Sequence, residues 1–350
     1  MSIRHAAPAL AAALLFGAST PLAKLLGDST SPVLLAGLLY LGSGVGLALL
    51  MAVRRALGRG DAVGGIPRRD VPWLAGAIVA GGVLGPALLM AGLATTAAAP
   101  AALLLNVEGV ATALIAWLVF KENADRQIVL GMLLIVAGGV LLAWQPGGTG
   151  VAPGALLIVA ACLCWAVDNN LTRKVSANDA LLIACLKGLC AGVVNTVLGL
   201  SGGAALPAAA PLAAMLVVGF AGYGLSLALF VVALRSLGTA RTGAYFSVAP
   251  LFGVLIAFAL WPQPPAWAFW PAAALMAIGV WLHLRERHEH PHTHTPMAHA
   301  HPHSHDAHHR HAHEFAWDGA EPHTHPHAHV PLTHAHAHYP DIHHRHPHPH

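Results

Sequence analysis

The chain has 350 residues, of which 56% are hydrophobic and only 9% are Asp, Glu, Lys or Arg. A soluble globular protein carries about 25% charged residues, so this composition argues against a cytosolic enzyme or a nucleic-acid-binding protein and indicates a membrane protein. The net charge is +3, and 24 of the 26 histidines lie in the last 65 residues. The chain therefore divides into an apolar part, 1–285, and a histidine-rich tail, 286–350.

The apolar part contains ten segments with the roughly 20 apolar residues that a membrane-spanning helix needs. In chain order they are 6–25, 32–53, 71–93, 97–119, 127–145, 152–171, 179–200, 211–234, 242–261 and 265–284. An alternative for the first segment is a cleaved signal peptide, since Arg4 precedes its apolar run. Removing that segment would break the charge pattern described next. We therefore expect an all-α integral membrane protein with ten transmembrane helices.

Positive charges lie on one side of this expected bundle. The loops of the other side contain no Lys or Arg, and they are found near 26–31, 94–96, 146–151, 201–210 and 262–264. Short cytoplasmic loops carry the excess of Lys and Arg in membrane proteins. The sequence therefore predicts a multi-pass inner-membrane protein with both termini, and so the tail, in the cytoplasm.

The second half of the apolar part repeats the first. At an offset of 141 the aligned residues are Ala113-Leu114-Ile115-Ala116 with Val254-Leu255-Ile256-Ala257, Gly81 with Gly222 and Gly138 with Gly279. At an offset of 149 they are Phe16 with Trp165, Thr20 with Asn169 and Lys24 with Arg173. Five helices per half is an odd number, so the copies insert in opposite senses, as in many secondary transporters. We expect five-helix repeats at 1–145 and 150–285; the alternative is a chance alignment of apolar sequence.

Several stretches resemble the EamA-type transporters of the drug/metabolite transporter superfamily. They are Phe16 to Lys24, Asn106-Val107-Glu108-Gly109 running to Phe120-Lys121-Glu122, the Gly131/Gly138 pattern, and Ser247-Val248-Ala249-Pro250. The sequence departs from the family where Gly109 replaces the usual proline and Gln263 the usual glutamate. The resemblance covers 1–285. It implies transport of a small metabolite, often its export, without ATP and without a required cofactor.

Polar residues inside the spans mark the expected substrate pathway, because a charged residue costs roughly 2.5–3.5 kcal/mol to insert in a membrane. Glu108 can bind a cationic group or carry a proton, and its alternative role is a structural ion pair with Lys187. Asp168 either lines the pathway or pairs with Arg173. The complete set of expected pathway residues is Glu108, Asn106, Asp168, Asn169, Lys187, Ser19, Thr20, Tyr223 and Tyr245.

The tail has few apolar residues and many prolines, so it is expected to be disordered. A shift of 35 residues aligns 290–313 with 325–348 at 15 of 24 positions, and His-x-His dominates both copies. This alternation puts two imidazoles on one side of an extended chain, and neutral imidazole favours Zn²⁺, Ni²⁺ and Cu²⁺. The expected ligands are His299, His301, His303, His308, His309, His311, His334, His336, His338, His343, His344 and His346.

These features predict a secondary transporter, not an enzyme, whose partners are the lipid bilayer, a small solute and divalent metal ions at the tail. One alternative is a Zn, Ni or Co transporter, but a metal pore would carry His, Asp or Cys ligands along its spans, where only Asp168, Glu108 and the cysteines qualify. Another is a membrane-anchored metal buffer or sensor, for which one or two helices would suffice. Alternatively, histidine protonation near pH 6.5 would draw the tail to anionic lipids.

Overall fold

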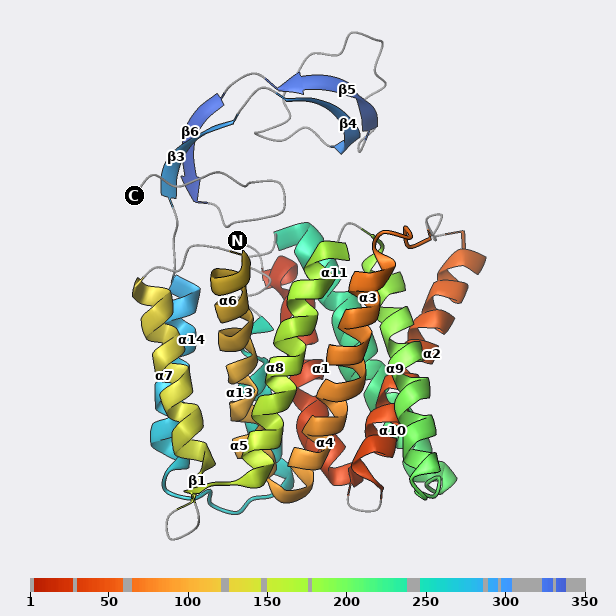
Figure 1. Cartoon of the computed structure of the whole chain (residues 1–350), viewed down its shortest axis with the longest axis vertical. Coiled ribbons are helices and arrows are strands. Elements are labelled where there is room, and N and C mark those ends of the chain that lie inside the picture. Colours follow the sequence, from red (N-terminus) through yellow and green to blue (C-terminus); the bar gives the residue numbers. More distant parts are fainter. Residues whose placement is uncertain are drawn as a thin grey trace. The chain divides into compact units, whose positions relative to one another are not determined.

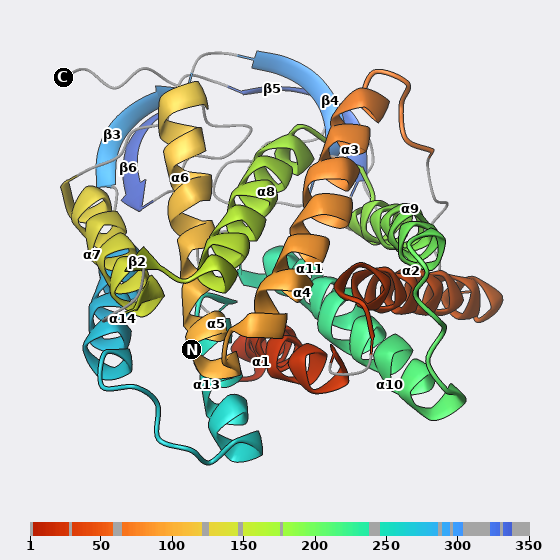
Figure 2. The ribbon, with the colours of Figure 1, turned by 60° about the horizontal axis from the view of Figure 1, so that its bottom comes forward.

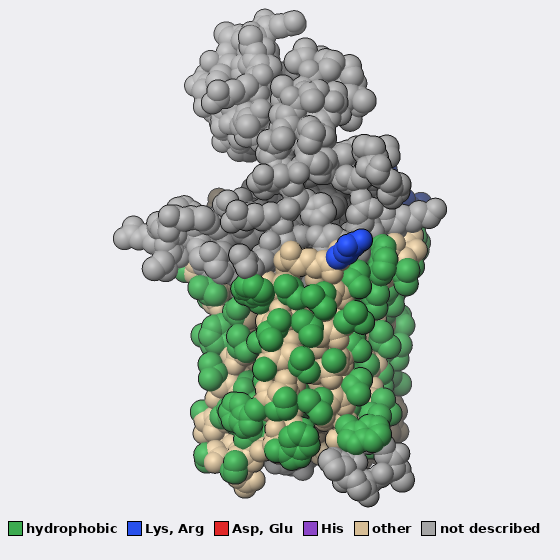
Figure 3. Space-filling model, turned by 90° about the vertical axis from the view of Figure 1, so that its left-hand side faces the viewer, with side chains coloured by type: hydrophobic (Ala, Val, Ile, Leu, Met, Phe, Trp, Pro, Cys, Tyr) green, Lys and Arg blue, Asp and Glu red, His purple; other side chains and the backbone are tan. Residues whose placement is uncertain are grey.

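The computed structural model describes residues 3–27, 30–58, 65–120, 126–145, 150–175, 178–237, 246–285, 289–294, 297–303, 323–329 and 332–337. The chain forms two units, Met1–Glu286 and Arg287–His350. The first unit is a bundle of helices (Figure 1), and the face of it seen in Figure 3 is covered largely by hydrophobic side chains. An apolar outer surface of this kind suits a bilayer rather than water.

The first half of the bundle comprises α1 (Ile3–Gly27), α2 (Pro32–Ala56), α3 (Val71–Ala77), the π-helix η1 (Ile78–Leu84), α4 (Gly85–Thr95), α5 (Ala98–Leu104), α6 (Asn106–Phe120) and α7 (Arg126–Ala143). The second half comprises α8 (Pro153–Val175), α9 (Ala180–Ser201), α10 (Ala209–Gly219), the π-helix η2 (Phe220–Leu225), α11 (Ser226–Leu237), α13 (Ala249–Leu260) and α14 (Phe269–Arg285). Between the halves, the short strands β1 (Trp144–Gln145) and β2 (Gly150–Val151) pair in antiparallel fashion.

The all-α membrane fold expected from the sequence is confirmed. Among the described residues, eight helices are long and apolar enough to cross a membrane, and Ala249–Leu260 and Phe269–Leu282 are shorter apolar helices. Three details differ from the expectation. The third and eighth segments each contain a π-helix, and the fourth is interrupted between α5 and α6. In the ninth segment the described apolar helix begins only at Ala249, and the expected residues 242–245 lie outside the described part.

Local sequence signals fix where two of the helices begin. The side chain of Ser31 accepts a hydrogen bond from the Leu34 amide at 3.3 Å, and Pro32 occupies the first helical position of α2. Asp179 Oδ1 accepts a hydrogen bond from the Leu181 amide at 2.8 Å at the start of α9. Both residue types cap the otherwise unpaired amides of a first helical turn, and proline suits the first position.

The two halves are joined by close contacts between helices of the same rank. α2 packs on α9 and α7 packs on α14, and these pairs lie side by side in both ribbon views (Figures 1 and 2). A Cβ atom on Gly44 of α2 would lie 2.7 Å from the Gly188 carbonyl carbon, and one on Gly279 of α14 would lie 2.7 Å from the Gly131 oxygen. Small residues therefore let the backbones approach closely, as helix packing in lipid requires.

Successive membrane helices alternate in direction. In Figure 1 the N-terminus lies at one end of the bundle and the β1–β2 connection, from which α8 starts, lies at the other. The first helices of the two halves, α1 and α8, therefore begin at opposite ends of the bundle.

The second unit contains four strands: β3 (Glu289–His294), β4 (Met297–His303), β5 (His323–His329) and β6 (Leu332–Ala337). β3 pairs with β6 and β4 with β5, both antiparallel. Disorder of the tail as a whole stays a prediction, and these four strands cover only part of it. The His-x-His alternation has the two-residue period of a strand, so it is compatible with extended pairing even though it supplies little apolar surface.

Candidate functional site

A buried ion pair joins α8 to α9. Lys187 Nζ lies 2.5 and 2.6 Å from the two carboxylate oxygens of Asp168, whose side chain is 8% exposed. One turn further along α8, the Thr172 hydroxyl donates to Asp168 Oδ1 at 2.8 Å. The alternative pairing of Lys187 with Glu108 is therefore wrong, because the ammonium group lies on Asp168. The sequence gives the depth of each charge in the membrane but not which helices face each other.

The π-helix η1 makes room for this pair. A Cβ atom on Gly81 would overlap the Asp168 carboxylate, so only glycine fits at this position without a rearrangement. The Gly81 carbonyl oxygen accepts hydrogen bonds from Trp165 Nε1 at 2.9 Å and from the Tyr40 hydroxyl at 3.2 Å. These donors come from α8 and α2, so they fix η1 against two other helices.

A third helix also binds the η1 backbone. Asn195 Nδ2, on α9, lies 3.3 Å from the Gly82 carbonyl oxygen and 3.2 Å from that of Val83. Asn195 is fully buried. Interruptions of the α-helical pattern leave backbone groups that side chains must satisfy in a membrane. The amide of Asn195 meets this requirement and ties η1 to α9.

Glu108 belongs to a separate polar group between α6 and α8. Asn169 Nδ2 donates to Glu108 Oε1 at 2.9 Å and to Thr112 Oγ1 at 3.2 Å. Thr112 follows Glu108 by one helical turn, so both lie on the face of α6 that meets α8. Asn169 is exposed, and Glu108 and Thr112 are half-buried. A Cβ atom on the neighbouring Gly109 would meet no atom within 4 Å, so open space adjoins the carboxylate-bearing turn.

Asn170 and Asn106 donate to backbone carbonyl oxygens. Asn170 Nδ2 donates to the carbonyl oxygen of Ala166 at 2.8 Å within α8. Asn106 Nδ2 donates to the carbonyl oxygen of Leu103 at 2.9 Å, where α5 gives way to α6. Asn170 Nδ2 also lies 3.4 Å from the carbonyl oxygen of Thr112, so the expected polar cluster 168–170 divides between α9, which Asp168 meets, and α6, which Asn169 and Asn170 meet. A pathway role for Asn106 stays a prediction.

Aromatic rings surround the expected gate of α1. Tyr223 of η2 lies with its ring centroid 6.0 Å from that of Phe16 and 5.4 Å from that of Tyr40. Ser19 and Thr20 are each 2% exposed, and the Ser19 hydroxyl donates to the Phe16 carbonyl oxygen at 2.6 Å. Gating by these residues stays a prediction, and Tyr245 lies outside the described residues.

Asp168 and Ser19 occupy equivalent places in the two halves. The offset of 149 that aligns Thr20 with Asn169 also aligns Ser19 with Asp168. Ser19 lies against η2, where a Cβ atom on Gly222 would be 2.6 Å from the Ser19 Cβ, and Asp168 lies against the aligned Gly81 of η1. The same contact is therefore neutral in one half and charged in the other.

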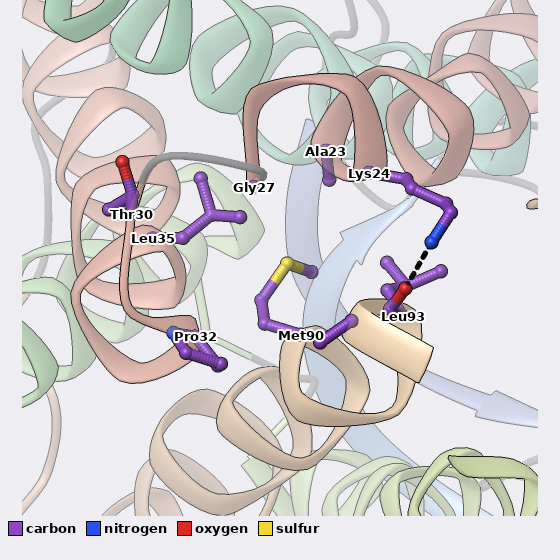
Figure 4. A pocket seen from close by; sticks show the side chains of 9 residues that line it. Ala23, Lys24, Gly27, Thr30, Pro32, Leu35, Met90 and Leu93 are labelled. Atoms are coloured by element: carbon purple, nitrogen blue, oxygen red, sulfur yellow. Dashed lines mark hydrogen bonds between the residues drawn. The ribbon is translucent and has the colours of Figure 1, made fainter. Parts of the chain in front are cut away.

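A cavity of about 200 Å³ lies where α1 ends and α2 begins. Its lining residues are Ala23, Lys24, Gly27, Thr30, Pro32, Leu35, Met90, Leu93 and Ala94. Figure 4 shows the Lys24 side chain reaching toward α4, where Nζ donates to the Leu93 carbonyl oxygen at 2.5 Å. The cavity thus places an ammonium group beside mainly apolar side chains.

Thr112 and Thr172 are not among the residues expected from the sequence, although their spacing could have identified them. Thr112 and Thr172 each follow an expected acidic residue by four positions, Glu108 and Asp168 respectively, and this spacing places them on the same helix face. Tyr40 has no such neighbour, and no local pattern identifies it.

Five of the expected tail ligands lie in described strands: His299, His301 and His303 in β4 and His334 and His336 in β6. The others, His308, His309, His311, His338, His343, His344 and His346, lie outside the described residues. Within the part of the chain where side chains are described, no three His, Cys, Asp or Glu residues come together in a way that could hold a metal ion.

Apolar helices arranged in two halves, with charged side chains gathered in the interior, define a multi-pass membrane transporter fold. The model of the EamA-like transporter family matches this chain twice, at residues 6–144 and 152–285. The chain therefore belongs to the EamA-like transporter family, within the drug/metabolite transporter superfamily.

The chain is also similar to one sequence relative and to one solved structure. A protein from Methanothermobacter thermautotrophicus, described as an uncharacterized transporter, is 29% identical over 271 residues, which cover 73% of this chain and 78% of the relative. A solved crystal structure matches with a TM-score of 0.58 at 20% identity and covers 79% of this chain and 95% of its own. At that identity the crystal structure supports the fold alone.

Proposed function

We propose that the protein is a secondary exporter of a small solute with a cationic nitrogen, such as a protonated amine, and that Glu108 binds that nitrogen or the coupling proton. The proposal rests on the difference between the two acidic residues of the interior, since Asp168 is paired with a lysine and Glu108 is bound to an uncharged amide. Lys187 is bound to Asp168 at 2.5 Å, whereas Glu108 accepts a hydrogen bond from the neutral amide of Asn169, which also donates to Thr112.

The chemistry of the Glu108 group favours a cation. A carboxylate within a membrane is costly unless a positive charge or a proton compensates it. The Asn169 amide donates one hydrogen bond at 2.9 Å but adds no charge. The exposure of Asn169 and the open space at Gly109 give a solute access to the same turn of α6. Glu108, Asn169 and Thr112 would then bind the solute together.

The architecture supports alternating access by two inverted repeats. The family match falls once on each half, and α1 and α8 begin at opposite ends of the bundle. In such transporters the substrate site lies between the halves, and Glu108 and Asn169 come from different halves. The Lys and Arg distribution supports cytoplasmic termini in the inner membrane. The export direction rests on the family resemblance.

Glu108→Gln tests this proposal. The substitution keeps the size and an acceptor for Asn169 but removes the charge. Purified protein in liposomes is assayed for exchange and for uphill transport with a panel of diamines, amino acids and carboxylates of matched size. Transport of the cationic members should fall at least tenfold, equivalent to about 1.4 kcal/mol of lost binding or transition-state stabilisation. Wild-type rates in Glu108→Gln would contradict the proposal.

A matched control separates function from folding. Asp70→Asn removes a carboxylate that accepts from Asn178 at 2.9 Å at the start of α3, away from the Glu108 group, and should leave transport unchanged. Both variants are compared for the folded fraction recovered by size-exclusion chromatography. Loss of exchange and uphill transport assigns Glu108 to solute binding. Loss of uphill transport alone assigns it to the coupling proton.

A further inference from the structure

The strand register of the tail sets histidines opposite histidines. In the β4–β5 ladder the opposed pairs are His299 with His327, His301 with His325 and His303 with His323. In the β3–β6 ladder they are His290 with His336 and His292 with His334. A slip of one residue in either direction would set each of these histidines against Ala, Pro, Thr, Ser or Glu instead of histidine. The observed register is therefore the one that gathers histidine positions.

Each ladder has one histidine face. Residues two apart in a strand share a face, and residues directly opposite in an antiparallel pair share it too. On one face of β4–β5 the register places the pair Met297 and His329 beside the three histidine pairs. Its other face carries Ala298 with Ala328, Ala300 with Pro326 and Pro302 with Thr324. In β3–β6 the two histidine pairs share their face with His294 and Leu332.

We infer that each ladder is a binding site for one or more divalent cations of the class that prefers imidazole, Zn²⁺, Ni²⁺ or Cu²⁺. Opposed positions have Cβ atoms about 4.5–5.5 Å apart, and successive positions on one face are about 6.5–7 Å apart along the strand. Two adjacent pairs thus bring four histidine positions within the span that tetrahedral ligation by imidazole nitrogens needs. The β3–β6 site would use His290, His292, His334 and His336.

Metal binding and strand pairing are coupled in this site. An isolated pair of strands is only marginally stable in water, and the faces without histidine carry mainly the small residues Ala, Pro and Thr, which bury little apolar area. Where a metal site exists only in the paired state, the free energy of binding becomes free energy of folding. The cation therefore stabilises the pairing that creates its own site. This inference goes beyond the proposed transport function and holds whichever solute the bundle carries.

The test uses the full chain in lipid nanodiscs with Zn²⁺ alone as the probe, and isothermal titration counts the ions bound. We expect at least two Zn²⁺ per chain, one or more for each ladder. His292→Ala should remove one ion, and adding His334→Ala, its register partner, should remove no more. Combining His292→Ala with removal of the three β5 partners, His323, His325 and His327, should remove both sites. Thr293→Ala, on the other face of β3, should remove none.

Hydrogen exchange gives an independent readout. Zn²⁺ should slow amide exchange at least tenfold in 289–294 and 332–337 of the wild type but not of His292→Ala. The inference is overturned if the wild type binds no Zn²⁺ or if Zn²⁺ leaves exchange in both segments unchanged. It is equally overturned if His292→Ala and His334→Ala lose ions additively, since independent ligands rather than a shared site would then bind the metal.

Discussion

Removing either member of the Asp168–Lys187 pair should destabilise the bundle far more than removing both. Asp168→Asn leaves the Lys187 ammonium with the Thr172 hydroxyl at 3.4 Å in place of a carboxylate at 2.5 Å. Lys187→Met leaves the Asp168 carboxylate enclosed against Gly81 of η1. The double variant has neither charge. A double-mutant cycle therefore measures whether the interaction between Asp168 and Lys187 stabilises the bundle.

The expected magnitude follows from the burial of the pair. Breaking a buried ion pair from one side costs about 3–5 kcal/mol, because an uncompensated charge remains. The side chains are 8% and 18% exposed, so some solvation remains and each single variant should lose about 3 kcal/mol. Replacing a buried pair by neutral residues is often close to neutral, so the double variant should lie within about 1 kcal/mol of the wild type.

Unfolding in mixed micelles with increasing SDS, followed by tryptophan fluorescence, measures these stabilities. The control is Arg69→Gln, which breaks an exposed contact with Asp70 at 3.7 Å; the Arg69 side chain is 87% exposed. Surface pairs of this kind contribute about 0–1 kcal/mol, so the control should lose little. If the double variant instead loses the sum of the two single losses, Asp168 and Lys187 do not act as a pair and the reasoning fails.

Two further predictions concern packing and orientation. Gly81→Ala should lower the folding stability by about 1–3 kcal/mol, because the added Cβ would overlap the Asp168 carboxylate. Gly109→Ala adds a Cβ with no atom within 4 Å, so it should change the stability little. Equal losses of stability in thermal unfolding would contradict this contrast. Reporter fusions in the loops should read external at one set of sites and internal at the other, and a mixed pattern would refute the orientation. The external sites are Ser31, Gly148 and Ala204, and the internal sites are Gly60 and Ala177.

The sequence was sufficient to predict the helices because lipid imposes a simple requirement on them. A span needs about 20 apolar residues, so the lengths of the apolar runs define the number of helices and their approximate ends. The segment expected at 32–53 is α2, Pro32–Ala56, and its start is signalled by the cap Ser31. The helix extends beyond the expected end at residue 53 and includes Arg54 and Arg55, because charged side chains can reach from a final helical turn into the interface.

The pairing of the charges could not be predicted from the same information. Glu108 and Asp168 are both acidic residues inside expected spans, so either could pair with Lys187, and the choice depends on which faces of α6, α8 and α9 meet. That arrangement depends on the π-helix η1, because Gly81 is the position that admits the Asp168 carboxylate. Residue preferences do not predict where a π-helix forms. The alignment of Gly81 with Gly222 marks both π-helices, but as a repeat and not as a change in helical pattern.

The pairing of the strands in the tail could not be predicted from the sequence either. Its 35-residue repeat suggests two equivalent copies, each with its own ligands. The strands instead pair 289–294 with 332–337 and 297–303 with 323–329, so the inferred sites would each draw ligands from both copies. Alternation predicts the face on which histidines lie, but register is a property of two strands together. His323, His325 and His327 enter the inferred site only through the strand register.

The unequal contacts of Ser19 and Asp168 bear on how the proposed repeats would exchange conformations. Alternating access by inverted repeats requires each half to adopt in turn the arrangement of the other. In the second half, Asp168 is bonded to Lys187 and Thr172 while it lies against η1. In the first half, Ser19 carries no charge, donates to the Phe16 carbonyl oxygen of its own helix and lies against Gly222 of η2. If that exchange separates α8 from α9, the step would cost the electrostatic free energy of a charged pair, which the uncharged Ser19 does not require in the first half. The two end states of the proposed cycle would then differ in energy before any solute binds.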